Sequence, residues 1–219
     1  MRCDLKNARK KIDKGEGMRV TSERELETKL AEAAREMLSS ARYHHVEGVV
    51  RTAEDLARRY DVDPRRARLA AWLHDLCKEW PKDELRAVLA SHHDTVWLSY
   101  SPALWHAPCA SYVGAERFGI DDMLVLEAVY VHTTGRGAMS KLDLILWVAD
   151  YIEPGRTFPE VHLARKLAYV DLEAAFYYGV RMTLLDLIEQ GLRVYPSMWQ
   201  AYDAYRTKQK VIDSVVQSS

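Results

Sequence analysis

A histidine and an aspartate stand side by side at His74 and Asp75, in the stretch LAAWLHDLCK. An imidazole nitrogen and a carboxylate oxygen from one turn suit borderline or hard divalent metals such as Fe, Mn or Zn. A lone histidine on an apolar helix face is more often a core residue than a ligand. The dipeptide therefore indicates a metal site only in combination with further ligands.

Three more histidines and a second aspartate extend the pattern: His45 before the dipeptide, then His106, His132 and Asp150 after it. His132 and Asp150 follow apolar residues of their own helix faces at three or four positions, so packing should bury them. A buried carboxylate without a strong partner costs several kcal/mol or takes up a proton. The order H…HD…H…H…D therefore favours a shared metal site over unrelated core residues.

Helices are expected to position these residues, because apolar residues recur with helical spacing from Ser22 onward and strand alternation is nowhere sustained. Ser22 and Glu25 have the spacing of a capping box, and Pro64 follows a capping Asp63. After the first helix, we expect helices at about 45–60, 63–78, 82–91, 107–118, 122–132, 140–152, 160–169, 172–190 and 197–213. The predicted fold class is all-α.

Composition excludes several classes of protein. The chain has 219 residues, 48% of them hydrophobic, and a formal net charge of −1, which provides no overall field for nucleic acid or an anionic membrane. No stretch approaches the roughly 18 apolar residues of a membrane span. Three cysteines without a CxxC pair argue against a disulfide framework and a thiolate zinc site. We therefore expect a cytoplasmic protein with no membrane partner and no nucleic-acid partner.

The predicted organisation has three parts. Residues 1–21 form a basic, mobile arm, residues 22–213 a single helical domain, and residues 214–219 a disordered tail. The arm is either a tether for RNA or phosphate or a solvated extension, and we favour the solvated extension.

The sequence segments that flank the candidate ligands identify a protein family more specifically than the ligands themselves do. They read RYHHVEGV, LHDLCK, LWHAPCASYVGAERFGI, HTTGRGAMS and VADYIEPGRTFP. Together they resemble the YqeK-type family of symmetrical bis(5'-nucleosyl)-tetraphosphatases, within the HD-domain metal-dependent phosphohydrolases. The resemblance covers about residues 23–195, whereas residues 196–205 follow the family only loosely. It points to His45 rather than His44 as the ligand.

This resemblance implies an HD-domain helical bundle with an internal dinuclear metal site. One metal would be held by His45, His74, Asp75 and Asp150, and a second by Asp75, as a bridging carboxylate, with His106 and His132. Iron is the metal that the family implies, while nitrogen and oxygen ligands leave Mn and other divalent ions open. The implied reaction is hydrolysis of diadenosine tetraphosphate to two ADP by a metal-activated hydroxide.

Several residues beside the ligands could contact the substrate. We assign catalytic roles to Asp75 and Lys78, because Lys78 would share a helix face with His74 and Asp75. Arg156 follows the turn at Pro154 and offers a guanidinium fork to a phosphate. The full set of substrate-binding candidates, with the ligands included, is Arg42, His45, Lys78, His106, His132, Thr133, Asp150 and Arg156. Glu153 is either a partner of a ligand or a surface acid.

Two other functions remain open at this point. The same ligands would serve an HD phosphohydrolase acting on a cyclic nucleotide, a deoxynucleoside triphosphate or a nucleoside monophosphate. The second hypothesis is a non-enzymatic RNA- or ribosome-associated module, which the neutral overall charge disfavours. The partner that we expect is a small dinucleoside polyphosphate, and a homodimer is left open.

Overall fold

Helices make up the regular structure of residues 23–218, the part of the chain that the computed structural model describes, and no strand occurs there. The predicted all-α class is therefore confirmed. The predictions for residues 1–21 and for Ser22 lie outside the described residues. None of the described helices is both long and apolar enough to cross a membrane.

The α-helices are α2 (Glu23–Met37), α3 (Ser40–Arg59), α4 (Pro64–Leu73), α5 (Lys82–Ser91), α6 (His106–Phe118), α7 (Met123–Val131), α8 (Lys141–Ile152), α9 (Val161–Ala168), α10 (Leu172–Glu189), α11 (Pro196–Tyr205) and α12 (Gln209–Gln217).

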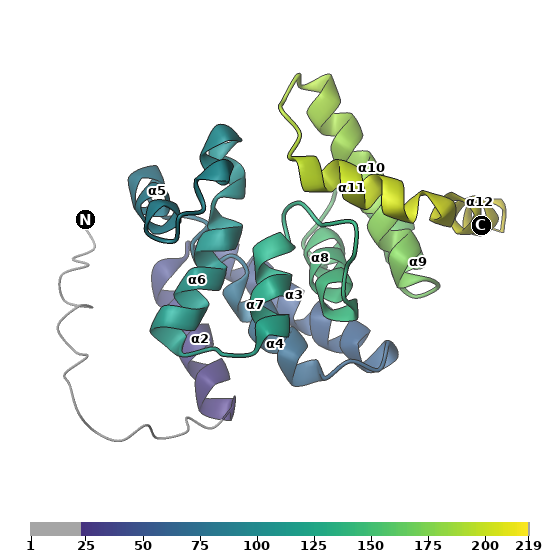
Figure 1. Cartoon of the computed structure of the whole chain (residues 1–219). Helices are drawn as coiled ribbons and strands as arrows, with labels where there is room; N and C mark the ends of the chain where they lie inside the picture. Colours follow the sequence, from purple (N-terminus) through teal and green to yellow (C-terminus); the bar gives the residue numbers. More distant parts are fainter. Residues whose placement is uncertain (1–22, 219) are drawn as a thin grey trace, which may run out of the picture.

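Four helices form the centre of the bundle. Helix α3 packs against α4 and α8, and α7 packs against α4, α6 and α8. Figure 1 shows α5 and α6 on one side of this centre and α9 to α12 on the other. Leu73, Val129, Ile145 and Leu146 are fully buried between the central helices. Five of the six candidate ligands therefore come from the central helices or from the turns that directly follow them, and His106 comes from the start of α6.

Helix α3 begins earlier than predicted, at Ser40. The side chain of Ser39 accepts a hydrogen bond from the backbone N–H of Arg42, and the backbone N–H of Ser39 donates to Glu79 at 2.7 Å. This cap satisfies amide groups that a helix start leaves unpaired. As a result, Arg42 and His45 both lie on the first two turns of one helix.

Helix α4 ends at Leu73, so the predicted helix through Lys78 is wrong beyond that residue. The backbone N–H of Leu76 donates to Leu73 O at 3.1 Å, and that of Lys78 donates to Asp75 O at 2.9 Å. These bonds span three residues, so the four-residue spacing that places residues on one α-helical face does not apply. His74 caps the helix, and Asp75 and Lys78 reach the site from tight turns.

The C-terminal prediction needs a similar correction. The single helix expected at 197–213 is divided into α11, the 3₁₀ turn η4 (Arg206–Lys208) and α12. Residues 214–217, predicted to begin a disordered tail, form the last turn of α12 instead. Apolar packing explains the difference, because Ile212 is buried and Val211 and Val215 pack against the core.

An ion pair between Arg136 and the buried Asp143 fixes the loop between α7 and α8. Asp143 is fully buried, and its Oδ2 accepts hydrogen bonds from Arg136 Nη2 at 2.7 Å and from the Ser140 backbone N–H at 3.0 Å. Ser140 in turn caps α8 in a capping box with Asp143. Since His132 precedes this loop and Asp150 lies on α8, the pair sets the relative position of two candidate ligands.

Replacing Asp143 should therefore destabilise the fold more than removing the cap alone. Asp143→Ala should lower the free energy of unfolding by about 2–3 kcal/mol, because it removes charge-assisted hydrogen bonds from a buried site. Ser140→Ala should cost only about 1 kcal/mol, the usual value of an N-cap. Urea unfolding followed by circular dichroism measures both. Equal losses in the two variants would contradict this role of the ion pair.

Candidate metal centre

The carboxylate of Asp75 lies at the centre of the cluster and is 3% exposed. Its Oδ1 is 3.1 Å from His106 Nε2 and 3.8 Å from His132 Nε2. Its Oδ2 is 3.7 Å from His45 Nε2 and 3.6 Å from His74 Nε2. Each carboxylate oxygen therefore faces a different pair of imidazoles, which is the arrangement that a bridging ligand requires.

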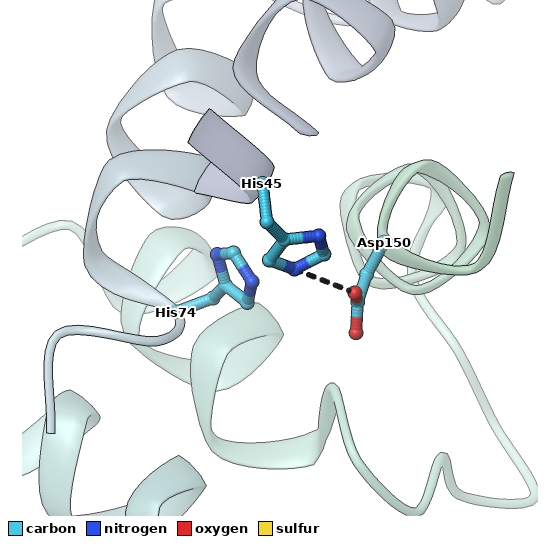
Figure 2. Close-up of side chains that lie close together, drawn as sticks. All are labelled: His45, His74 and Asp150. Carbon is cyan, nitrogen blue, oxygen red and sulfur yellow. Dashed lines mark ion pairs between the residues drawn. The ribbon is translucent and has the colours of Figure 1, made fainter. Parts of the chain in front are cut away.

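The candidate ligands form two groups on the two sides of this carboxylate. In the first group, ligand atoms of His45, His74 and Asp150 lie within 4.8 Å of one another, and those of Asp75, His106 and His132 do so in the second. Figure 2 shows the first group, with three side chains that point toward one another from α3, the end of α4 and α8. His45 Nε2 is 3.1 Å from Asp150 Oδ1 in this group. The structure thus brings together all six residues selected from the sequence.

Hydrogen bonds fix how two of the rings face the cluster. His74 Nδ1 donates to Ala71 O at 2.6 Å, and His132 Nδ1 donates to Val129 O at 2.7 Å. A carbonyl can only accept, so each Nδ1 carries the proton and each Nε2 lone pair points into the cluster. Nε2 of His74 is also buried without a hydrogen-bond partner, and so is Nε2 of His45. Unpartnered imidazole nitrogens beside carboxylate oxygens are a donor set that fits a divalent cation.

The protonation states of His74, His106 and Asp75 fit the same interpretation. Burial lowers the pKa of both His74 and His106 to about 4, so these rings are neutral at pH 7. Burial alone would raise the pKa of Asp75, but its interaction with His74 and its contacts with His106 and His132 outweigh this and hold it well below the usual range. Neutral imidazoles and ionised carboxylates are the forms that bind metal.

Glu153 orients His45, which decides between the two roles that the sequence left open. It is 4% exposed; its Oε1 accepts a hydrogen bond from His45 Nδ1 at 3.1 Å, and its Oε2 accepts one from the Gly155 backbone N–H at 2.6 Å. A Cβ at Gly48 would lie 2.5 Å from Oε2, so glycine provides the necessary room. Gly48, one helical turn after His45, was a signal that sequence reasoning missed.

Three cationic side chains border the cluster. Arg42 Nη1 lies 3.0 Å from Asp75 Oδ2, and Arg156 Nη2 lies 2.6 Å from Asp150 Oδ1. Lys78 Nζ lies 3.5 Å from His106 Nε2, and burial lowers the pKa of this lysine. The side chains of Arg42 and Arg156 remain 29% and 35% exposed, so both can also meet a ligand from solvent. Positive charge on this rim is suited to a phosphate chain.

The loop after His132 has a buried hydroxyl group without a hydrogen-bond partner, that of Thr133. Thr133 Oγ1 is buried and has no hydrogen-bond partner, whereas Thr134 Oγ1 donates to Gly135 O at 3.2 Å. Arg136 is held by the ion pair with Asp143 described above. Thr133 is therefore the residue of this loop with a group left to offer a ligand.

An all-helical bundle with histidines and aspartates converging on a buried centre is the architecture of HD-domain proteins, and the HD domain family matches residues 42–155. The chain is 37% identical over 170 residues to the symmetrical bis(5'-nucleosyl)-tetraphosphatase of Bacillus subtilis, covering 77% of this chain and 91% of that protein. It is 40% identical over 176 residues to the protein of the same name from Halalkalibacterium halodurans, covering 79% and 93%.

A solved structure agrees with these matches. It is described as a predicted HD superfamily hydrolase involved in NAD metabolism from Clostridium acetobutylicum, and it superposes with a TM-score of 0.76 at 31% identity over 83% of this chain and 97% of that chain. The chain belongs to the symmetrical bis(5'-nucleosyl)-tetraphosphatase family. The resemblance found in the sequence is confirmed.

The neighbouring histidines of α3 provide a test of the ligand assignment. His45 faces the cluster, whereas His44 is exposed and its Nδ1 donates to Ser40 O at 2.7 Å. His45→Ala should therefore reduce the metal content of the purified protein, and His44→Ala should leave it intact. Elemental analysis of both variants measures this, and the reverse pattern would place the wrong histidine at the centre.

Proposed function

We propose that this protein hydrolyses diadenosine tetraphosphate symmetrically and releases two ADP. The name of the relatives, which are 37% and 40% identical to this chain over 170 and 176 residues, supports the reaction. The observation that carries the proposal for this chain is the Asp75 carboxylate, which faces one pair of imidazoles through each oxygen. The same centre could serve another nucleotide substrate, and product analysis distinguishes the two.

The residues proposed to hold metal are the two groups described above, with Asp75 shared between them. Divalent ions at these positions would supply Lewis acidity toward phosphoryl oxygens and would lower the pKa of water. Iron is the proposed metal on the family resemblance, although nitrogen and oxygen donors would also accept Mn. His45, His106, His132 and Asp150 would contribute to substrate binding through these ions.

The remaining residues act directly on the phosphate chain. Lys78 and Arg42 lie on the Asp75 side of the cluster, and Arg156 lies on the Asp150 side, so positive charge flanks the centre. Thr133 can donate a hydrogen bond from its hydroxyl group to a phosphoryl oxygen. Water attacks one of the two inner phosphorus atoms, and the central bridging P–O bond breaks. The charge of the departing ADP is stabilised by the flanking cations, and one proton of the water is released or taken up by a product phosphate.

Product chromatography is the direct test of the reaction. Metal-loaded protein incubated with diadenosine tetraphosphate should yield ADP as the sole nucleotide product, because cleavage at the central bridge leaves two phosphates on each adenosine. Formation of ATP and AMP would contradict symmetrical cleavage. Activity toward cyclic nucleotides or nucleoside monophosphates, without turnover of the tetraphosphate, would instead support the alternative substrate class.

Lys78 provides a test of the proposed phosphate contacts. Lys78→Ala should lower kcat by about 10²-fold, equivalent to about 2.7 kcal/mol of transition-state stabilisation, with unchanged metal content. The exposed Lys82 on α5 is the matched control, and Lys82→Ala should retain wild-type kcat. Unaltered kinetics in Lys78→Ala would make this lysine a structural residue.

Several expectations remain predictions. A cytoplasmic location and the absence of a nucleic-acid partner are predicted from the composition, iron is predicted from the family resemblance, and a homodimer is left open. Residues 1–21, where an RNA tether was considered, lie outside the described structure.

A further inference from the structure

The segment 152–156, which we term the strap, joins two functional side chains. It follows Asp150 at the end of α8, and it carries Glu153, whose carboxylate accepts from His45, and Arg156, whose guanidinium contacts Asp150. The backbone N–H of Arg156 donates to Glu153 O at 3.0 Å. That bond lies within the strap, and the Glu153 backbone N–H and Arg156 Nε attach the strap to Ala149 O and Asp150 O of α8, at 3.0 Å each.

Arg165 attaches the strap to a second helix, α9. Its Nε donates to Ile152 O at 2.9 Å, and its Nη2 donates to Glu153 O at 2.7 Å and to Arg156 O at 2.9 Å. One planar guanidinium thus holds three carbonyls spread along the strap. An ammonium group cannot reproduce this fixed fork, because its three protons surround a single point.

Two of these three carbonyls lie at the end of a helix. Ile152 is the last residue of α8 and Glu153 is its C-cap, so neither carbonyl accepts from a following helical turn, although Glu153 O also accepts from the Arg156 backbone N–H. A cation at a helix C-terminus is also favoured by the helix dipole. These reasons explain why arginine is stable here, and the attachment has a consequence for the metal centre.

We propose that Arg165 is a positioning residue for metal binding. By holding the strap against α9, it keeps the Glu153 carboxylate on His45 and the Arg156 guanidinium on Asp150. Without Arg165, the side chains of His45 and Asp150 would be free to turn away from His74, the third member of the first group. The second group, formed by Asp75, His106 and His132, has no contact with the strap among the described residues and would be spared. The inference rests on the metal site proposed above and not on the identity of the substrate.

Binding of Mn²⁺ to the full-length, metal-depleted protein tests this without substrate. Titration followed by electron paramagnetic resonance should show that Arg165→Ala weakens one of two bound ions by about 10-fold, the lower end of the range for residues that support a ligand. Arg165→Lys should recover part of the loss. Arg181→Ala is the matched control, since Arg181 is a half-buried arginine whose Nη1 donates to Gln209 on α12. The control should bind Mn²⁺ as the wild type does.

A double-mutant cycle separates positioning from general stability. If Arg165 acts through Glu153, Arg165→Ala should add less than about 2-fold to the loss caused by Glu153→Ala, because coupled residues are not additive. Additive losses, or lower thermal stability with wild-type Mn²⁺ affinity, would overturn the inference. If Arg165→Ala does not fold, the same Mn²⁺ titrations are made with Arg165→Lys. A wild-type protein that binds no Mn²⁺ would overturn the metal site and this inference together, whereas wild-type binding that Arg165→Ala retains would overturn this inference alone.

Discussion

The structure depends on one buried carboxylate, that of Asp75, in the middle of a helical bundle. An ionised carboxylate taken out of water is destabilising by several kcal/mol unless hydrogen bonds, opposite charge or metal compensate it. Here four imidazole nitrogens lie within 3.1 to 3.8 Å of its two oxygens, and Arg42 lies 3.0 Å from one of them. The helices that provide these groups must keep their relative positions for the carboxylate to remain ionised.

Helix ends, more than helix faces, deliver the ligands to this centre. His74 and His132 are the C-caps of α4 and α7, and His106 is the first residue of α6. At both C-caps, Nδ1 donates to a carbonyl three residues earlier, in the last turn of the helix. The same local device therefore satisfies a helix terminus and directs Nε2 inward. His45 and Asp150 are different, since they lie within helices and rely on the strap for their support.

Sequence reasoning found the ligands because their types are chemically unusual on apolar helix faces, and it found most helices because periodicity is a local property. It wrongly extended the helix of α4 to Lys78. The change from four-residue to three-residue hydrogen bonds after Leu73 leaves the apolar pattern unaltered, so the sequence does not reveal it. It could not decide the role of Glu153, whose partner His45 is 108 residues away. The role of Arg165 cannot be predicted for a different reason: its partners are backbone carbonyl oxygens, which every residue has and which therefore give no signal in a sequence.

The sharing of Asp75 between two ions is the central claim, and anomalous diffraction from crystals of the metal-loaded protein tests it most directly. Data collected at the absorption edge of Mn or Fe should show two peaks on opposite sides of the Asp75 carboxylate, one beside His45 and one beside His106. A single peak, or two peaks of which neither contacts Asp75, would contradict the account.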